Sequence, residues 1–225
     1  MSNLNLQSAK AELIRAANHL NATGVLFKGE HANLSARLTD GNIVITRGGN
    51  IGNLNEDSFA VVTLQGATVQ GQIDPTTAEI VEMHTAVYRV RDSIGCIIHC
   101  HAPYATVFAI AHQPIPVVYE PLMRFGITEP IPVVPWAPRG SEASVGGIVN
   151  LVKEHPNTAA VLLANHGILG FASDPAQTSQ MLATIDEAAQ LVLQSQAIGG
   201  PKELPEEAFE RVRARMQQFA SPVTV

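Results

Sequence analysis

The sequence predicts a mixed α/β fold built around one hydrophobic core. Its 225 residues are 46% hydrophobic and 15% charged, a composition typical of a single globular domain that buries most of its apolar surface. Apolar, β-branched runs of strand length alternate with segments in which apolar residues recur every three or four positions. Because both periodicities occur along the chain, we expect helices and strands to share one core within residues 1–225.

The first elements expected are one helix and several strands. Apolar residues at helical steps between Leu6 and Leu20 predict an amphipathic helix. A strand ending near Arg37 and a second over 42–46 follow, and residues 59–69 have the pattern of a β-hairpin. The segment 47–52, rich in glycine, lies beside these strand ends. It can either present backbone N–H groups to an anion or simply turn the chain.

Glu79 lies where a further helix is expected to begin. Thr76 and Glu79 have the spacing of a capping box, and a helical apolar stripe follows as far as Val90. Glu79 can therefore cap its own helix by accepting from the Thr76 amide. A carboxylate in a first helical turn also suits a base, because the helix dipole favours its ionised form. Local sequence leaves both roles open.

Two histidines end the most apolar strand expected in the chain. His99 and His101 are two residues apart, so their side chains point to the same face of a strand, as two metal ligands would. Taken alone, a pair of this kind is as often merely polar side chains at a strand end. Cys96 and Cys100 have the opposite phase and lie roughly 13 Å apart on an extended strand, too far for a disulfide.

The second half repeats the alternation of helices and strands. A second apolar strand delivers His166, followed by a glycine that lets the backbone turn. The elements expected here are helices over 104–111, 141–153, 174–198 and 205–219, and strands over 117–118, 132–134, 158–164 and 168–171. We expect the last helix to be a surface or subunit-contact element.

The charge argues against several classes of partner, and the first residues argue against secretion. The formal charge of −6 and the pI near 5.7 provide no basic field for nucleic acid or an anionic membrane. Residues 1–10 are polar and lack the hydrophobic segment of a signal peptide. With two cysteines that cannot pair locally, we expect a cytoplasmic protein.

The motifs, taken in order, resemble the class II aldolase/adducin family. They are a Gly-x-x-x-Asn-x-Ser-x-Arg turn, a Thr-x-x-Gly turn, a Glu at a helix start, a His-x-His-x-Pro-Tyr strand and a late Asn-His-Gly. The resemblance runs from about Leu6 to Ile198. It implies one three-layer α/β/α domain with a central, mostly antiparallel sheet, a helical extension over 199–225, and a cyclic homotetramer with active sites between subunits.

Carried over residue by residue, the resemblance makes His99, His101 and His166 the ligands of one divalent metal ion per chain. It makes Glu79 the acid/base. Zinc is favoured, with manganese, iron and cobalt as alternatives, and the reaction implied is carbon–carbon cleavage of a small hydroxy-carbonyl compound through a metal-bound enediolate. The adducin branch is a non-catalytic alternative, but it lacks the metal residues present here. Surface or packing positions are expected for His19, His31, His84, His112 and His155.

The substrate segments depart from the pattern of the family's sugar-phosphate aldolases. Hydroxyl donors that hold phosphate there are missing, which favours a substrate other than a typical sugar phosphate. The ligand contacts expected are Asn33, Arg47, Gly49 and Thr77. Arg139 takes a place near that of an aromatic residue, and a guanidinium suits a planar carboxylate. Decarboxylation of a hydroxy or keto acid is therefore the alternative reaction.

Overall fold

The structure is a computed structural model that describes residues 4–26, 28 and 30–220. Within these residues, eight strands form one sheet in the order β4-β3-β2-β1-β5-β8-β7-β6. Neighbouring strands are antiparallel throughout, except β6 and β7, which are parallel. The strands are β1 (Ala32–Arg37), β2 (Ile43–Thr46), β3 (Phe59–Val62), β4 (Thr68–Gln70), β5 (Cys96–Cys100), β6 (Val133–Val134), β7 (Ala160–Leu163) and β8 (Gly167–Ala172).

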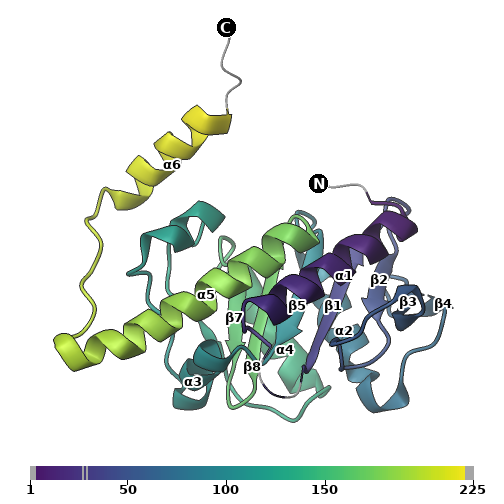
Figure 1. The fold of residues 1–225 in the computed structure, drawn as a ribbon. Helices are drawn as coiled ribbons and strands as arrows, with labels where there is room; N and C mark the ends of the chain where they lie inside the picture. Colours follow the sequence, from purple (N-terminus) through teal and green to yellow (C-terminus); the bar gives the residue numbers. More distant parts are fainter. Residues whose placement is uncertain (1–3, 27, 29, 221–225) are drawn as a thin grey trace, which may run out of the picture.

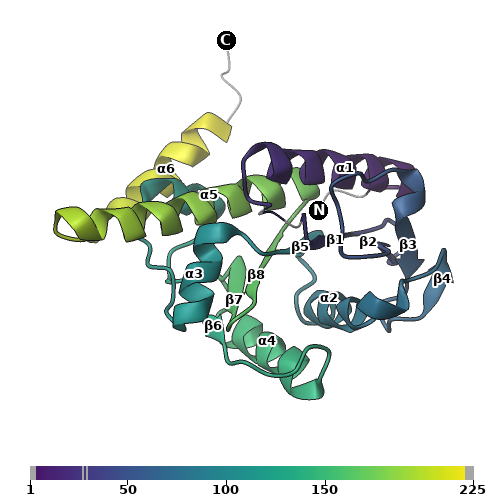
Figure 2. The same ribbon diagram turned by 60° about the horizontal axis from the view of Figure 1, so that its bottom comes forward.

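Helices cover both faces of this sheet, so the predicted α/β fold with a central, mostly antiparallel sheet is confirmed (Figures 1 and 2). Helices α1 and α5 run side by side over one face, and α2 and α4 pack on the other. The helices are α1 (Leu6–Ala22), α2 (Glu79–Val90), α3 (Pro103–Ala111), α4 (Glu142–Glu154), α5 (Pro175–Ser195) and α6 (Ala208–Ala220).

Alternation along the central strand β5 separates two hydrophobic clusters. Ile98 belongs to the cluster under α1 and α5, whereas Ile97 belongs to the cluster under α2 and α4. Because side chains alternate along a strand, His99 shares the face of Ile97. Cys96 and Cys100 take the opposite face, where both are buried free thiols. The face that carries α2 therefore also carries the strand histidines.

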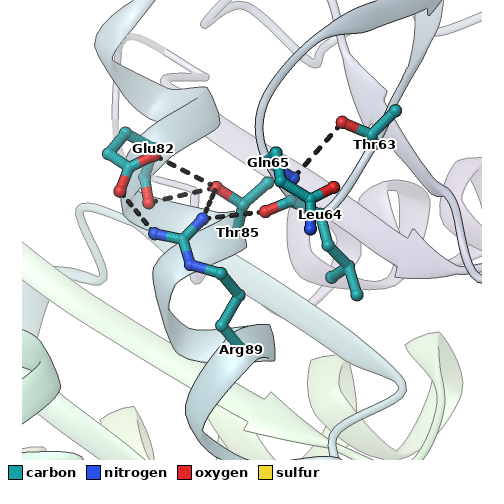
Figure 3. A network of polar contacts seen from close by, with 6 residues as sticks. All are labelled: Thr63, Leu64, Gln65, Glu82, Thr85 and Arg89. Atoms are coloured by element: carbon teal, nitrogen blue, oxygen red, sulfur yellow. Dashed lines mark hydrogen bonds and ion pairs between the residues drawn. The ribbon is translucent and has the colours of Figure 1, made fainter.

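Arg89 holds α2 against the loop between β3 and β4 (Figure 3). Its Nη1 donates to the carbonyl oxygen of Leu64 at 2.8 Å and to Oγ1 of Thr85 at 3.0 Å. Its Nη2 forms an ion pair with Glu82, about two turns earlier in the helix. These contacts are largely exposed, so we expect them to orient α2 rather than to contribute much stability.

One expected strand is wrong, in the proline-rich connection after α3. Residues 117 and 118 are not in a strand, and Ile115 instead forms an isolated antiparallel bridge with Ile131. Prolines leave this connection few N–H donors, so it cannot extend a ladder. The next expected strand is observed, as the two-residue edge strand β6.

The chain after α5 leaves the sheet and leads to α6, which projects from the body in Figure 1. Helix α6 packs near η3 (Glu120–Phe125), a short 3₁₀ helix. The division into a core over 6–198 and an extension over 199–225 stays a prediction. In the described part of the chain, no helix is long and apolar enough to span a membrane.

Candidate metal centre

Three histidines, in or next to the neighbouring strands β5 and β8, meet at one end of the sheet. His99 lies in β5, His101 follows that strand directly, and His166 lies in the turn between β7 and β8. One ring nitrogen from each lies within 4.8 Å of the others. Ring centroids are 4.7 Å apart for His99 and His166, and 4.9 Å apart for His101 and His166. The third histidine is therefore brought to the first two by strand pairing.

Hydrogen bonding fixes the tautomer of His99. Its Nδ1 lies 2.9 Å from the carbonyl oxygen of Ile168, and a carbonyl can only accept, so Nδ1 carries the proton. The lone pair is consequently on Nε2, which is buried and has no hydrogen-bond partner among the described residues. Nε2 of His101 is buried and equally unpartnered in that part of the chain. A hydrogen bond from the other ring nitrogen, like that of His99 to Ile168, is usual for a metal-binding imidazole.

Burial keeps these three rings neutral. Desolvation, followed by the neighbouring imidazoles, holds the pKa of His99 well below its usual value. Desolvation lowers the pKa of His101 to about 4 and also lowers that of His166. Neutral imidazoles offer lone pairs, and unpartnered buried nitrogens are costly without something to bind. The donor set fits a divalent metal ion held by three nitrogens, which leaves positions for a substrate.

Gly167 allows the two histidine-bearing strands to approach each other. A Cβ at this position would lie 2.5 Å from the carbonyl oxygen of Cys100 and 3.0 Å from Cδ2 of His101. The preceding Asn165 has φ of 58°, and its Oδ1 lies 2.7 Å from Nε2 of His112 at the end of α3. The left-handed turn and the glycine together place His166 beside β5.

The Gly167→Ala variant is expected to lose about 1–3 kcal/mol of unfolding free energy, the usual cost of overpacking, and to bind metal more weakly. The physical reason is that the backbone carbonyl of Cys100 cannot move without displacing His101. Chemical denaturation and metal titration measure the two effects. Gly146→Ala is the matched control, because a Cβ there has open space within α4. Equal behaviour of the two variants would contradict the close approach.

A cavity of about 40 Å³ lies beside the histidines. Its lining consists of His31, Asn33, Thr77, Glu79, Ile80, Met83, His99, Arg139, Gly140, Ser144, Val145, Leu163 and His166. Nη2 of Arg139 lies 3.3 Å from Oε1 of Glu79, with the two side chains 60% and 27% exposed. The carboxylate and the guanidinium thus face each other across the cavity mouth.

Glu79 is not held by the capping box that its spacing predicts. The amide of Thr76 donates to Oδ1 of Asp74 at 2.9 Å, so it is not left for Glu79. Asp74 begins the short helix η2 (Pro75–Thr77) in this way, and α2 starts at Glu79 with no side-chain cap. Of the two roles that local sequence leaves open for Glu79, the capping role is therefore not realised, and the carboxylate pairs with Arg139 instead.

Three of the expected ligand contacts lie at or against the cavity. Asn33 pairs with His99 across β1 and β5 and lines the cavity, where it is 2% exposed. Thr77 also lines it, although its hydroxyl lies 3.2 Å from the carbonyl oxygens of both Arg47 and Asp74. Gly49 packs on His31 so closely that a Cβ would lie 2.8 Å from Nδ1 of that ring.

The structure does not bring the side chain of Arg47 into this cavity. Its Nε donates to the carbonyl oxygen of Gln72 at 2.7 Å and Nη1 donates to that of Asp57 at 3.2 Å. These contacts place it in a separate hollow beyond the end of β2. The carboxylate of Glu30 lies against Gly52 and does not line the cavity either. Gly29, before it in the turn motif, lies outside the described residues.

Two of the histidines assigned to surface or packing positions lie close to the site, His31 on the cavity wall and His84 buried behind Asn33. His31 lines the cavity, and its ring centroid is 4.8 Å from that of His101. His84 is fully buried in α2, and its Nε2 lies 2.6 Å from Oδ1 of Asn33. Its position among the apolar residues of α2 is a sequence signal for an interior histidine. Its hydrogen-bond partner Asn33, however, is 51 residues away in the sequence.

Acid is expected to destabilise the fold through His84. Burial lowers its pKa from 6.5 to about 3, so the unfolded chain binds the extra proton more readily. The contribution of the neutral ring to the free energy of unfolding is complete above pH 6.5 and is lost as the pH falls toward 3. The loss between pH 7 and pH 5 is about 2 kcal/mol. Denaturation of metal-free protein across this range measures it. The slope should flatten in His84→Gln, and an unchanged slope would contradict a neutral buried ring.

Comparison with known proteins agrees with this geometry. The family described as Class II Aldolase and Adducin N-terminal domain matches residues 11–193. A 5-deoxy-D-ribulose 1-phosphate aldolase from Bacillus thuringiensis serovar kurstaki is 26% identical over 220 residues, or 95% of this chain and 98% of that protein. A 3-oxo-tetronate 4-phosphate decarboxylase from Escherichia coli O6:H1 is 27% identical over 193 residues, or 83% and 86% of the two chains.

A solved structure of an L-fuculose 1-phosphate aldolase superposes with a TM-score of 0.81 at 28% identity, covering 93% of this chain and 96% of that one. The aldolases and the decarboxylase are lyases, and their similarity over most of the chain supports the same class of enzyme here. The family is metal-dependent, and the three histidines provide a group that could bind the ion. The chain belongs to the class II aldolase and adducin family.

Proposed function

We propose that this protein is a metal-dependent carbon–carbon lyase of the aldolase type, acting on a small hydroxy-carbonyl compound. The observation that carries the proposal is a cluster of three neutral histidines beside the cavity that Glu79, His99 and His166 line. His99, His101 and His166 would hold one divalent ion per chain, with zinc favoured for a three-nitrogen set. A non-catalytic, adducin-like role does not account for the buried, unpartnered nitrogens of His99 and His101.

The chemistry divides between the ion and the side chains around it. A bound divalent ion would polarise the substrate carbonyl and stabilise the negative charge that carbon–carbon cleavage leaves behind. Glu79 would move the proton to or from the carbon next to that carbonyl, because it is the carboxylate on the cavity wall. Asn33 and Arg139 would hold substrate oxygens from two sides.

The substrate assignment rests on the donors that face the cavity. Thr77 directs its hydroxyl to backbone carbonyls, Gly49 is covered by His31, and the Arg47 guanidinium points elsewhere. The chain therefore offers few hydroxyl donors for a phosphate dianion. We propose a substrate other than a typical sugar phosphate, and a cytoplasmic homotetramer by family resemblance.

The direct test compares two ketoses as substrates of the metal-loaded protein. One is 5-deoxyribulose 1-phosphate, the compound in the name of the Bacillus thuringiensis relative, and the other is its unphosphorylated form. Release of a short aldehyde from the unphosphorylated ketose at a comparable or higher kcat/KM supports both parts of the proposal. A much faster reaction of the phosphorylated ketose would show that the phosphate site is retained. Binding of both compounds without cleavage would favour the non-catalytic role.

Decarboxylation of a hydroxy or keto acid is the second candidate, favoured by Arg139. Its guanidinium is the cation at the cavity mouth, and bidentate binding of a carboxylate is what this group does best. Loss of carbon dioxide would leave the same kind of charge next to the carbonyl as aldol cleavage. Release of carbon dioxide from a keto acid, without an aldehyde product, would identify this reaction.

The Arg139→Met variant is expected to raise KM for an acidic substrate by about tenfold or more, the usual loss for a hydrogen bond to a charged group. Steady-state kinetics measures the change. Arg124→Met is the matched control, since Arg124 is exposed in a separate hollow beside α6. If both variants keep the KM of the unmodified protein, Arg139 does not bind substrate.

A further inference from the structure

Four buried polar side chains form a continuous chain of hydrogen bonds beneath the cavity. Oδ1 of Asn33 lies 2.6 Å from Nε2 of His84, and Nδ1 of His84 lies 2.6 Å from Oγ of Ser35. Oγ of Ser35 then lies 2.9 Å from the hydroxyl of Tyr88. Asn33 is 2% exposed and the other three are fully buried. The chain joins β1 to α2, the helix that begins with Glu79.

In a series of this kind the donor and acceptor roles can be arranged in two opposite ways. The Tyr88 end of the series decides between them. Burial raises the pKa of Tyr88 well above its usual value, so its hydroxyl keeps its proton and can donate it. Within the described residues, Oγ of Ser35 is the acceptor available to it. Ser35 must then donate to Nδ1 of His84, and the remaining ring proton lies on Nε2.

This arrangement fixes the amide of Asn33. A protonated Nε2 of His84 can bond only to an acceptor, so the carbonyl oxygen of the amide faces His84. The amide nitrogen, with its two N–H donors, faces the other way. Because Asn33 lines the cavity beside His99, those donors are presented to whatever binds there. An amide free to rotate could offer either its donors or its oxygen.

We infer that His84 is a positioning residue, which holds Asn33 so that it offers N–H donors to an acceptor oxygen of the substrate. The substrate part of this inference rests on the proposed function, whereas the proton arrangement does not. The oxygen recognised is an acceptor, such as that of a carboxylate, a phosphate or a carbonyl. Burial lowers the pKa of His84 to about 3, which keeps the ring neutral and suited to both hydrogen bonds.

The first arm of the test is spectroscopic and needs no substrate. Nitrogen-15 NMR of protein labelled at histidine distinguishes a proton on Nε2 from one on Nδ1, and His84→Gln identifies the signals of His84. We expect a neutral ring protonated at Nε2. A ring protonated at Nδ1, or one that exchanges between the two forms, would overturn the inference whatever the protein catalyses.

The second arm is kinetic and uses whichever ketose of the pair above is cleaved. His84→Leu should raise KM by roughly tenfold to a hundredfold, the worth of a hydrogen bond to a charged group, and His84→Gln should restore much of the loss because it keeps an N–H donor. Metal content and melting temperature show that each variant is folded. An unchanged KM in folded His84→Leu would reduce His84 to packing and overturn the inference.

Asn33→Asp separates donor presentation from packing. The carboxylate can still accept from His84 but offers oxygens to the cavity instead of N–H groups. We expect a folded protein whose KM rises at least as far as in His84→Leu, and an unaltered KM would show that Asn33 gives no donor to the substrate. If the unmodified protein cleaves neither ketose, the proposed function fails, and the NMR arm still decides the role of His84.

Discussion

The His101→Ala variant is expected to lose its metal ion and its turnover together. Metal affinity should fall by more than about a hundredfold, since removing merely the hydrogen-bond partner of a metal ligand costs about ten- to a hundredfold. Turnover should fall by at least roughly a thousandfold, because even one lost donor to developing charge costs a hundred- to a thousandfold. Metal titration and initial rates on the cleaved ketose measure the two losses.

The matched control for that variant is His155→Ala. His155 lies away from the cavity, with Nδ1 3.3 Å from Oε2 of Glu129 at the surface. We expect it to keep both metal and turnover. A His101→Ala protein that binds metal as tightly as the unmodified chain would show that the ion, if present, is held elsewhere.

The Glu79→Gln variant is expected to keep its metal and lose turnover. The substitution preserves size and removes only the charge and the proton-accepting ability, so kcat should fall by about a hundred- to ten-thousandfold, the usual worth of a general acid or base. Elemental analysis should find the metal content unchanged. This split distinguishes a proton-transfer residue from a metal ligand.

Glu82→Gln provides a close control for the variant at Glu79. Both carboxylates lie in the first turn of α2, and each pairs with an arginine, but Glu82 faces Arg89 outside the cavity (Figure 3). Loss of the exposed Glu82 pair should cost less than about 1 kcal/mol of stability and leave kcat unchanged. Full turnover of Glu79→Gln would remove Glu79 from the reaction.

Much of the fold could be predicted because the local spacing of apolar residues distinguishes helices from strands. The two-residue spacing of His99 and His101 fixes their shared face as soon as β5 is recognised, and Ile97 and Ile98 mark the two sides of the sheet. The assignment of His166 came from the resemblance, since spacing alone does not tell which distant strand will pair with β5. The expected strand at 117–118 failed because proline removes ladder donors.

The site was less predictable wherever contacts between distant residues decide it. Glu79 has the spacing of a capping box, but Asp74 takes the Thr76 amide. Arg47 has the charge of a ligand contact, yet two backbone carbonyls turn its side chain away. His31 and His84 gain their places from Gly49 and Asn33, each remote in sequence. Such pairings depend on how the strands and α2 assemble rather than on local pattern.

The most direct test of the central claim is the metal content of the native chain. Elemental analysis should be made on protein purified without added metal and without a histidine tag, beside His101→Ala prepared in the same way. We predict about one divalent ion per chain, lost in the variant, as a three-nitrogen site requires. No ion in either protein, even after reconstitution, would contradict the metal-dependent lyase and favour a folded, non-catalytic module.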